Sequence, residues 1–223
     1  MYASYPAIYR DKNGQKVTSV QLANNGQRLT MIVRGIQFSG DSFSHLSSSQ
    51  DTADANLRAF TINQETNWLQ AFNIACDIPI LVVERGEVVE GMLKVNCVVG
   101  APEDNYKDDY LQLTLMFGES AFQSQGSELG FEDEMGDLQG KLPKGDYIKS
   151  CSNCIFSAYD PYCNSGLMGE LACFVNSTDK YTTVRGKGYP GWGYSSNKRE
   201  YVPVQEFYLC QHFNAGRLEN LEE

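Results

Sequence analysis

Short stretches of alternating apolar and polar residues dominate the first half of the chain. Lys16–Leu22 alternates, and Arg28–Phe38 does so less strictly, a pattern typical of half-buried β-strands. Asn25-Gly26 lies between the two stretches and is a strong hairpin-turn signal. Asn13-Gly14 predicts an earlier turn, which would join Ala7–Arg10 to the first of these strands. The chain is therefore expected to begin as a series of antiparallel hairpins.

More strands are predicted as far as residue 117. The segment 39–56 is polar and rich in Ser and Asp, so we interpret it as a loop, whereas Asn67–Ile74 fits either a short helix or a strand. Arg85-Gly86-Glu87 is expected to be a turn between two strands. Apolar or alternating runs occur at Leu57–Ile62, Ile80–Glu84, Gly91–Val99 and Tyr110–Phe117. Together these runs predict a mainly β (α+β) fold, in which an N-terminal antiparallel sheet forms a sandwich or open barrel.

One short helix is predicted after the sheet. Phe131, Met135, Leu138 and Leu142 are spaced by four, three and four residues, which places them on one helical face. Pro143 follows directly and is expected to end the helix. The two glycines within this segment weaken it, so the helix should depend on packing against the rest of the protein.

The pattern divides the chain into two regions. Residues 1–118 form the β-rich N-terminal region, and residues 131–217 form a C-terminal subdomain in which cysteines and aromatic residues concentrate. Residues 119–130 are polar and rich in Gly and Ser, so we interpret them as a linker or surface loop. A single continuous domain is the alternative, since 223 residues fit either arrangement.

Four cysteines of the C-terminal region have the spacing of a zinc site. Cys151 and Cys154 form a C-x-x-C pair, Cys173 follows after 18 residues, and Cys210 after 36 more. A tight turn lets two thiolates reach one ion, and four thiolates close the coordination sphere of Zn²⁺, so the predicted zinc is structural. Ordinary reduced cysteines and a redox pair are the alternatives. The redox reading is weakened because no βαβ pattern surrounds the pair.

Other cysteines and one histidine compete with this assignment. Cys163, which is near Cys154, and His212, which is near Cys210, are alternative candidates for one of the four ligand positions. Cys76 and Cys97 lie in apolar, strand-like sequence, and we interpret both as small buried hydrophobic residues.

The C-terminal residues resemble an uncharacterised bacterial domain of unknown function. The resemblance rests on C-x-x-C-x-x-S-x-Y-x-P from Cys151, G-x-x-x-C-F from Gly169, and Q-E-x-Y-x-C-x-x-F from Gln205. It covers residues 131–217, and the N-terminal region resembles the family only loosely. Cys163 departs from the family pattern. The resemblance implies the same cysteines but no activity; proteins of this kind include immunity proteins that are encoded beside toxins.

The charge of the chain bears on its partners. The formal net charge is −10 and the isoelectric point is about 4.7, which disfavours nucleic acid and favours a basic partner. The N-terminus lacks the features of a signal peptide, and no apolar run is long enough to span a membrane. We therefore expect a cytoplasmic protein that binds neither membrane nor nucleic acid.

Catalytic signatures are scarce. His45 and His212 are the two histidines, and no nucleophile elbow, phosphate-binding loop or zinc-protease motif is present. Two groups of residues are instead candidates for partner binding. The acidic residues Glu132, Asp133 and Asp137 would steer a basic partner, although acids at the start of a helix also stabilise its dipole. Tyr189, Trp192 and Tyr194 lie in a Gly-rich loop and would be aromatic anchors, although a hairpin tip is the simpler reading.

These observations favour a non-enzymatic, acidic bacterial binding protein of the immunity type, which neutralises a partner protein, such as a basic secreted toxin, by occlusion. A metal- or carboxylate-dependent hydrolase is one alternative. A structural or regulatory zinc-binding module is the other.

Overall fold

The structure is a computed structural model. It describes residues 3–23, 28–49, 56–100, 109–126, 130–158, 171–176, 202–208 and 210–215.

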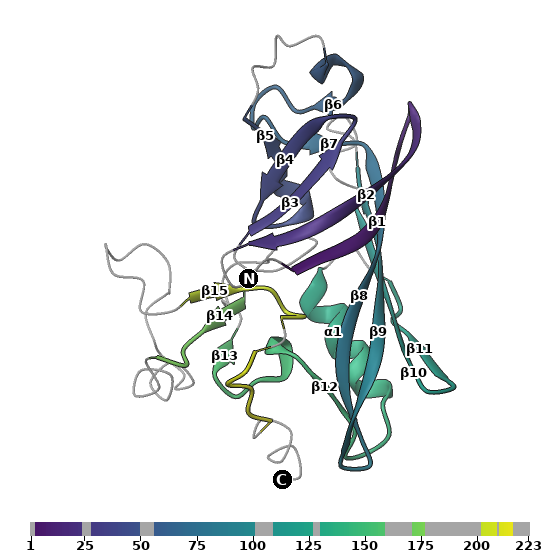
Figure 1. The fold of residues 1–223 in the computed structure, drawn as a ribbon, viewed down its shortest axis with the longest axis vertical. Helices are drawn as coiled ribbons and strands as arrows, with labels where there is room; N and C mark the ends of the chain where they lie inside the picture. Colours follow the sequence, from purple (N-terminus) through teal and green to yellow (C-terminus); the bar gives the residue numbers. More distant parts are fainter. Residues whose placement is uncertain are drawn as a thin grey trace.

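A large antiparallel sheet forms the body of the protein (Figure 1). Its strand order is β11-β10-β9-β8-β1-β2-β3-β4-β5, and β12 pairs with β8 at the end that β1 does not reach. Among the described strands no pairing closes the sheet into a barrel. The predicted mainly β fold with a large antiparallel sheet is thus confirmed. The strands of this sheet are β1 (Ala3–Asp11), β2 (Gly14–Ala23), β3 (Arg28–Val33), β4 (Ile36–Gly40), β5 (Ser47–Ser48), β8 (Phe72–Glu84), β9 (Glu87–Val99), β10 (Tyr110–Phe117), β11 (Ser120–Gln123) and β12 (Tyr147–Lys149).

The β8–β9 hairpin is the longest element of the sheet. It is paired from Phe72 and Val99 to Glu84 and Glu87. Arg85 and Gly86 form its turn with φ angles of 51° and 86°, as a two-residue hairpin turn of the I′ type requires. The turn predicted at this place is confirmed.

Several local predictions were wrong. Arg28–Phe38 is two strands, because Arg34 and Gly35 both have positive φ and turn β3 into β4. The loop predicted over 39–56 contains a 3₁₀ helix, η2 (Phe43–His45), and the strand β5. The strand predicted over 57–62 begins as a 3₁₀ helix, η3 (Leu57–Ala59), before the short strand β6 (Thr61–Ile62). For the segment 67–74 the strand alternative is confirmed, since it contains β7 (Leu69–Gln70) and the start of β8. The turn at Asn25-Gly26 lies outside the described residues.

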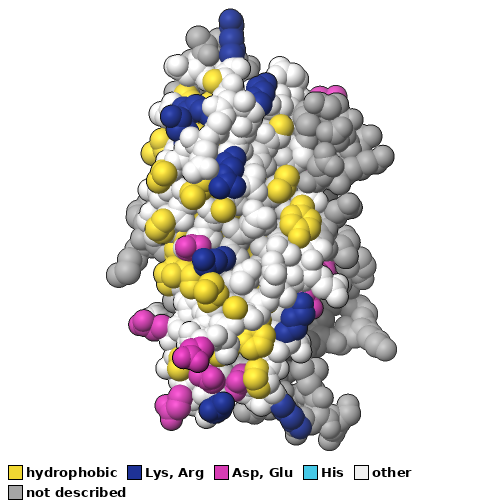
Figure 2. All heavy atoms as spheres, turned by 90° about the vertical axis from the view of Figure 1, so that its right-hand side faces the viewer, with side chains coloured by type: hydrophobic (Ala, Val, Ile, Leu, Met, Phe, Trp, Pro, Cys, Tyr) yellow, Lys and Arg dark blue, Asp and Glu magenta, His cyan; other side chains and the backbone are white. Residues whose placement is uncertain are grey.

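The main core lies between the inner face of the sheet and the helix α1 (Phe131–Lys141), which packs against β10 and β11. Phe131, Met135, Leu138 and Leu142 are all buried there, so the predicted helical face is confirmed. Residues 120–123, expected in a linker or loop, form the edge strand β11. The opposite face of β8–β11 is turned to solvent (Figure 2).

A second, smaller sheet lies beside α1 (Figure 1). It consists of β13 (Ser157–Ala158), β14 (Leu171–Cys173) and β15 (Val202–Val204), in that order. The buried residues Cys151, Leu171, Cys173 and Val204 form its hydrophobic cluster. Phe207 follows β15 but belongs to the main core, where it contacts Tyr5 and Phe131. The segment 202–208 therefore joins the two parts of the protein.

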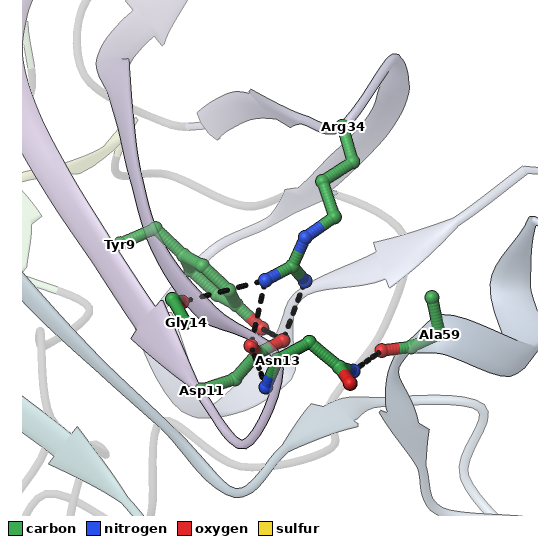
Figure 3. A network of polar contacts seen from close by, with 6 residues as sticks. All are labelled: Tyr9, Asp11, Asn13, Gly14, Arg34 and Ala59. Carbon is green, nitrogen blue, oxygen red and sulfur yellow. Dashed lines mark hydrogen bonds and ion pairs between the residues drawn. The ribbon is translucent and has the colours of Figure 1, made fainter.

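A network of charged and polar groups connects β1, β2 and β3 (Figure 3). Arg34 donates two hydrogen bonds to the Asp11 carboxylate, at 2.6 and 2.7 Å. The Tyr9 hydroxyl and the Asn13 backbone N–H also donate to this carboxylate. The guanidinium of Arg34 lies 5.7 Å from the ring centroid of Tyr9 and 5.3 Å from that of Phe60. The network fixes the β1–β2 turn against the β3–β4 turn.

In the part of the chain that the structure describes, no helix combines the length and apolar character that crossing a bilayer requires.

Candidate metal centre

The C-x-x-C pair forms a compact turn. Cys151 begins a 3₁₀ helix, η5 (Cys151–Asn153), and the Cys154 backbone N–H donates to the Cys151 carbonyl at 3.1 Å. The Ser157 hydroxyl lies within hydrogen-bond distance of the carbonyl oxygens of both cysteines. Both thiols are buried, with 2% and 3% of each residue exposed. The turn thus holds the two thiols on one short stretch of rigid backbone.

Asn153, between the two cysteines, fastens this turn to α1. Its side-chain amide donates to Gln139 Oε1 and to the Ile148 carbonyl, each at 2.9 Å. Gln139 also accepts from the Ile148 N–H and donates to the Asp146 carbonyl. Sequence reasoning missed Gln139 because its part in the site depends only on how α1 packs.

Cys173 and Cys210 reach the turn from distant segments. Cys173 pairs with Ser157 in the register of β13 and β14. The segment before Cys210 is bound to η5, since the Cys151 N–H donates to the Tyr208 carbonyl at 3.2 Å and the Ser152 N–H to the Glu206 carbonyl at 2.9 Å. Cys151, Cys173 and Cys210 consequently pack in one cluster.

Two of the sulfurs accept backbone hydrogen bonds. The His212 N–H donates to Cys210 Sγ at 3.3 Å, and the Val175 N–H donates to the Cys173 sulfur. In both cases the donor is two residues after the cysteine. Donors directed at a sulfur favour the thiolate, which is the form that binds metal.

The four thiols influence one another electrostatically. Burial raises the pKa of the Cys151 thiol, and the neighbouring Cys210, Cys154 and Cys173 raise it further. Among the described residues, however, no three His, Cys, Asp or Glu side chains lie close enough together to hold an ion. The donor set matches zinc in residue type, and Cys151, Cys173 and Cys210 pack together. A change of cysteine rotamer moves a sulfur without moving the backbone.

The alternative ligand His212 is less well placed than the four cysteines, and the remaining cysteines are not part of this cluster in the described residues. His212 is exposed, and its ring bonds the neighbouring Gln211 side chain. Cys163 lies outside the described residues. Cys76 and Cys97 are buried on the inner face of β8 and β9, as predicted, and burial raises the pKa of Cys76 to about 12.

The predicted partner-binding acids differ in their surroundings. Glu132 and Asp133 are exposed in the first turn of α1. Asp137 instead binds Lys141 at 2.8 Å and accepts the Gln125 N–H at 2.7 Å, and the bond from Lys141 is the main cause that lowers its pKa. The proposed aromatic anchors Tyr189, Trp192 and Tyr194 all lie outside the described residues.

The structure adds one polar pair that the sequence did not indicate. His45 Nδ1 lies 2.9 Å from Asp41 Oδ1, and the imidazole stacks on Trp68 with 4.2 Å between ring centroids. These three residues line a shallow surface hollow. The spacing of four between Asp41 and His45 was the available signal, but it is weak in a serine-rich segment.

Comparison with known families identifies the chain. Residues 3–157 match a family of unknown function (DUF6304), so the chain belongs to that family. The predicted resemblance to an uncharacterised family is confirmed, although the match takes in the main sheet and ends just after the C-x-x-C turn. No curated protein and no solved structure matches the chain.

Proposed function

We propose that this protein is a non-enzymatic bacterial binding protein whose C-terminal part is held by one structural zinc ion on Cys151, Cys154, Cys173 and Cys210. It would act in the cytoplasm, where thiols remain reduced, and would neutralise a basic protein partner, such as a toxin, by occlusion. Zinc would supply four coordinate bonds among segments that are far apart in sequence.

The observation that carries the metal proposal is the pair of backbone N–H groups directed at the Cys173 and Cys210 sulfurs. A buried neutral thiol gains little from such a donor, whereas a metal-bound thiolate keeps much of its negative charge and is stabilised by it. The hydrogen bonds from η5 to the segment 206–208 support the same assignment, because they bring Cys210 beside Cys151.

Substitution of one ligand tests the metal site. The purified protein should contain about one zinc per chain, and Cys154→Ser should release it and lower stability, because the three remaining thiolates no longer close the coordination sphere. Elemental analysis and thermal unfolding measure the two effects. Cys76→Ala is the matched control, since it removes a buried thiol of the main core and should leave the zinc content unchanged. A metal-free native protein whose thiols all titrate would contradict the assignment.

The net charge of −10 supports a basic partner, because a long-range field of one sign steers an oppositely charged protein and raises its association rate. Glu132 and Asp133 are the acids of α1 whose side chains project into solvent at its N-terminal end. The carboxylate of Asp137 already has a cationic neighbour, so its contribution to steering should be smaller.

A matched pair of substitutions tests the steering. For the protein that copurifies with this chain, Asp133→Asn should lower the association rate a few-fold at low salt, and added salt should remove the difference. Asp137→Asn should lower the association rate less than Asp133→Asn does, and should lower the stability of the folded protein more.

Trp192→Ala should raise the dissociation rate by an amount worth about 2 kcal/mol if Trp192 anchors the complex. Surface plasmon resonance measures both rates. An association rate that is independent of salt would contradict the electrostatic mechanism.

A further inference from the structure

The solvent-facing side of the main sheet carries a continuous apolar row. Pro79 of β8 lies opposite Met92 of β9, Met92 lies opposite Met116 of β10, and Met116 lies opposite Ala121 of β11. Pro79 and Ala121 are exposed, and 40% of Met116 is exposed. A sheet face that contacts water ordinarily carries polar residues. Apolar side chains that adjoin across four strands are instead typical of an interaction surface.

Charges of opposite sign lie on the two sides of this row. Along β9, Lys94 is two residues from Met92 in one direction and Glu90 is two residues from it in the other. Beyond Lys94, Arg10 on β1 pairs with Asn73 at the start of β8. Beyond Glu90, the sheet ends at the hairpin tip, where Glu84 and Glu87 add negative charge although their places in the strands direct them to the opposite face.

Figure 2 shows this surface: apolar groups occur over its whole height with a cluster near the middle, most Lys and Arg lie in the upper half with some at the lower edge, and Asp and Glu gather in the lower part. Asp77 beside Lys94, and Arg85 and Lys149 towards the acidic end, reduce this polarity without reversing it. The face therefore has a basic end and an acidic end, although the chain as a whole is strongly acidic.

We propose that this face binds a second copy of the same chain. A two-fold axis that lies in the interface and runs across the strands would place the apolar row of one copy on that of the other. The same operation would place each basic end on an acidic end, with Lys94 facing Glu90 of the second copy. Sheets commonly pack face to face in this way, about 10 Å apart and with strands nearly aligned.

The distribution of charge on this face favours a second copy of the chain over other protein partners. A uniformly basic protein would meet Arg10 and Lys94, and an acidic one would meet Glu90 and the negative charge of the hairpin tip. Only a surface with the reversed distribution of charge matches both ends, and the face itself has that distribution when it is turned around. Three strands over about eight residues each and two over about four extend over roughly 500 Å² at the usual strand spacing. That approaches the roughly 600 Å² per partner at the small end of specific interfaces.

The mass of the full chain in solution tests the proposal. Sedimentation equilibrium should give twice the 24.9 kDa of one chain. Met92→Lys should raise the dimer dissociation constant by roughly tenfold or more, since it places a charge at the centre of the apolar row. Ile32→Lys is the control, because Ile32 is an apolar strand residue with 53% exposed that lies on β3 away from the row. The thermal unfolding temperature of each variant shows that the fold is kept.

A charge exchange distinguishes this arrangement from any other contact. Lys94→Glu and Glu90→Lys should each weaken the dimer, because like charges then face each other across the axis. The double substitution should restore it, because the two charges have only exchanged places. A chain that is monomeric at high concentration would overturn the proposal. So would a dimer that Met92→Lys leaves intact, or a double variant as weak as the single ones. The test is independent of zinc content and of any partner protein.

Discussion

Asp11 and Arg34 form the most constrained ion pair among the described residues. Their side chains are 5% and 17% exposed, and the two parallel hydrogen bonds hold both groups in a fixed geometry. The Tyr9 hydroxyl and the Asn13 N–H occupy the remaining acceptor positions of the carboxylate. A buried charge that is satisfied in this way costs little, but the loss of one partner leaves the other charge uncompensated.

Asp11→Asn should therefore lower the free energy of unfolding by about 3 kcal/mol at neutral pH. The guanidinium of Arg34 would stay between the rings of Tyr9 and Phe60 without its counter-ion. Urea unfolding followed by circular dichroism measures the difference. Glu65→Gln is the control, because Glu65 is exposed in the turn between β6 and β7, and it should change stability by no more than about 0.5 kcal/mol.

The same pair predicts a dependence on pH. Burial alone would raise the pKa of the Asp11 carboxyl, but the hydrogen bonds from Arg34, Asn13 and Tyr9 outweigh it and hold the pKa below the usual 3.8. A group whose folded-state pKa is lowered contributes its full stabilisation above its unfolded-state pKa and loses it as the pH falls through the folded-state value. The stability gap between wild type and Asp11→Asn should thus be constant above about pH 5 and shrink below pH 3.8. A gap that widened in acid would contradict the role assigned to Arg34.

At the scale of single elements, the β8–β9 hairpin contains an identifiable local strain. Arg85 occupies the first turn position with a φ of 51°, a conformation that a long side chain disfavours and that Asn tolerates. Its backbone N–H donates to Asp146 Oδ1 at 2.7 Å, and this bond does not depend on the side chain.

Arg85→Asn should consequently raise the free energy of unfolding by about 0.5 kcal/mol, because the turn needs positive φ at both positions. Gly86→Ala is a matched substitution with the opposite expected effect. It should lower the free energy of unfolding by about 1 kcal/mol, because Gly86 has a φ of 86°, which disfavours a residue with a Cβ atom. Thermal unfolding of the two variants in parallel measures both effects. Destabilisation by Arg85→Asn would mean that the Arg85 side chain makes a contact more important than the turn geometry.

The success of sequence reasoning differed between elements for physical reasons. The helix α1 was predicted well, because spacings of three and four among Phe131, Met135, Leu138 and Leu142 reflect one buried face. The β3–β4 hairpin was missed because Arg34-Gly35 lacks the Asn-Gly signature, although the buried positions change from odd numbers in β3 to even numbers in β4. The short edge strand β11 was missed because it has only four residues, lies in a Gly- and Ser-rich segment, and pairs with one strand, β10.

The candidate site was predictable in its ligands but not in its supports. C-x-x-C spacing marks a turn on its own, so Cys151 and Cys154 could be singled out from sequence. The bonds from Asn153 to Gln139, and from η5 to the segment 206–208, join elements that approach only after α1 has packed on the sheet. No local pattern contains that information. The pairing of β1 with β8 escaped prediction for the same reason.

At the scale of the whole molecule, the two hydrophobic clusters are very unequal. The main cluster takes in the inner face of the large sheet, α1 and Phe207. The cluster of the smaller sheet contains only four buried residues among those described, and two of them are cysteines. Among the described residues, this small cluster offers little apolar burial against the conformational entropy of ordering the strands of the smaller sheet. The proposed zinc ion would add stability to this sheet.

Removal of the metal should for this reason unfold one part of the molecule and leave the other. With a strong chelator, backbone amides of β13, β14 and β15 and of the segment 210–215 should exchange with deuterium much faster, because the four coordinate bonds are lost. Amides of β8, β9 and β10 should keep their protection, since their core contains none of the proposed ligands. Hydrogen exchange followed by mass spectrometry resolves the two regions, and Phe207 allows a sharper comparison. Phe207→Ala removes a side chain from the main core, so it should speed exchange in both regions while zinc is still bound. If chelation left β13–β15 as protected as before, the smaller sheet would be stable without metal, and zinc would have no structural role.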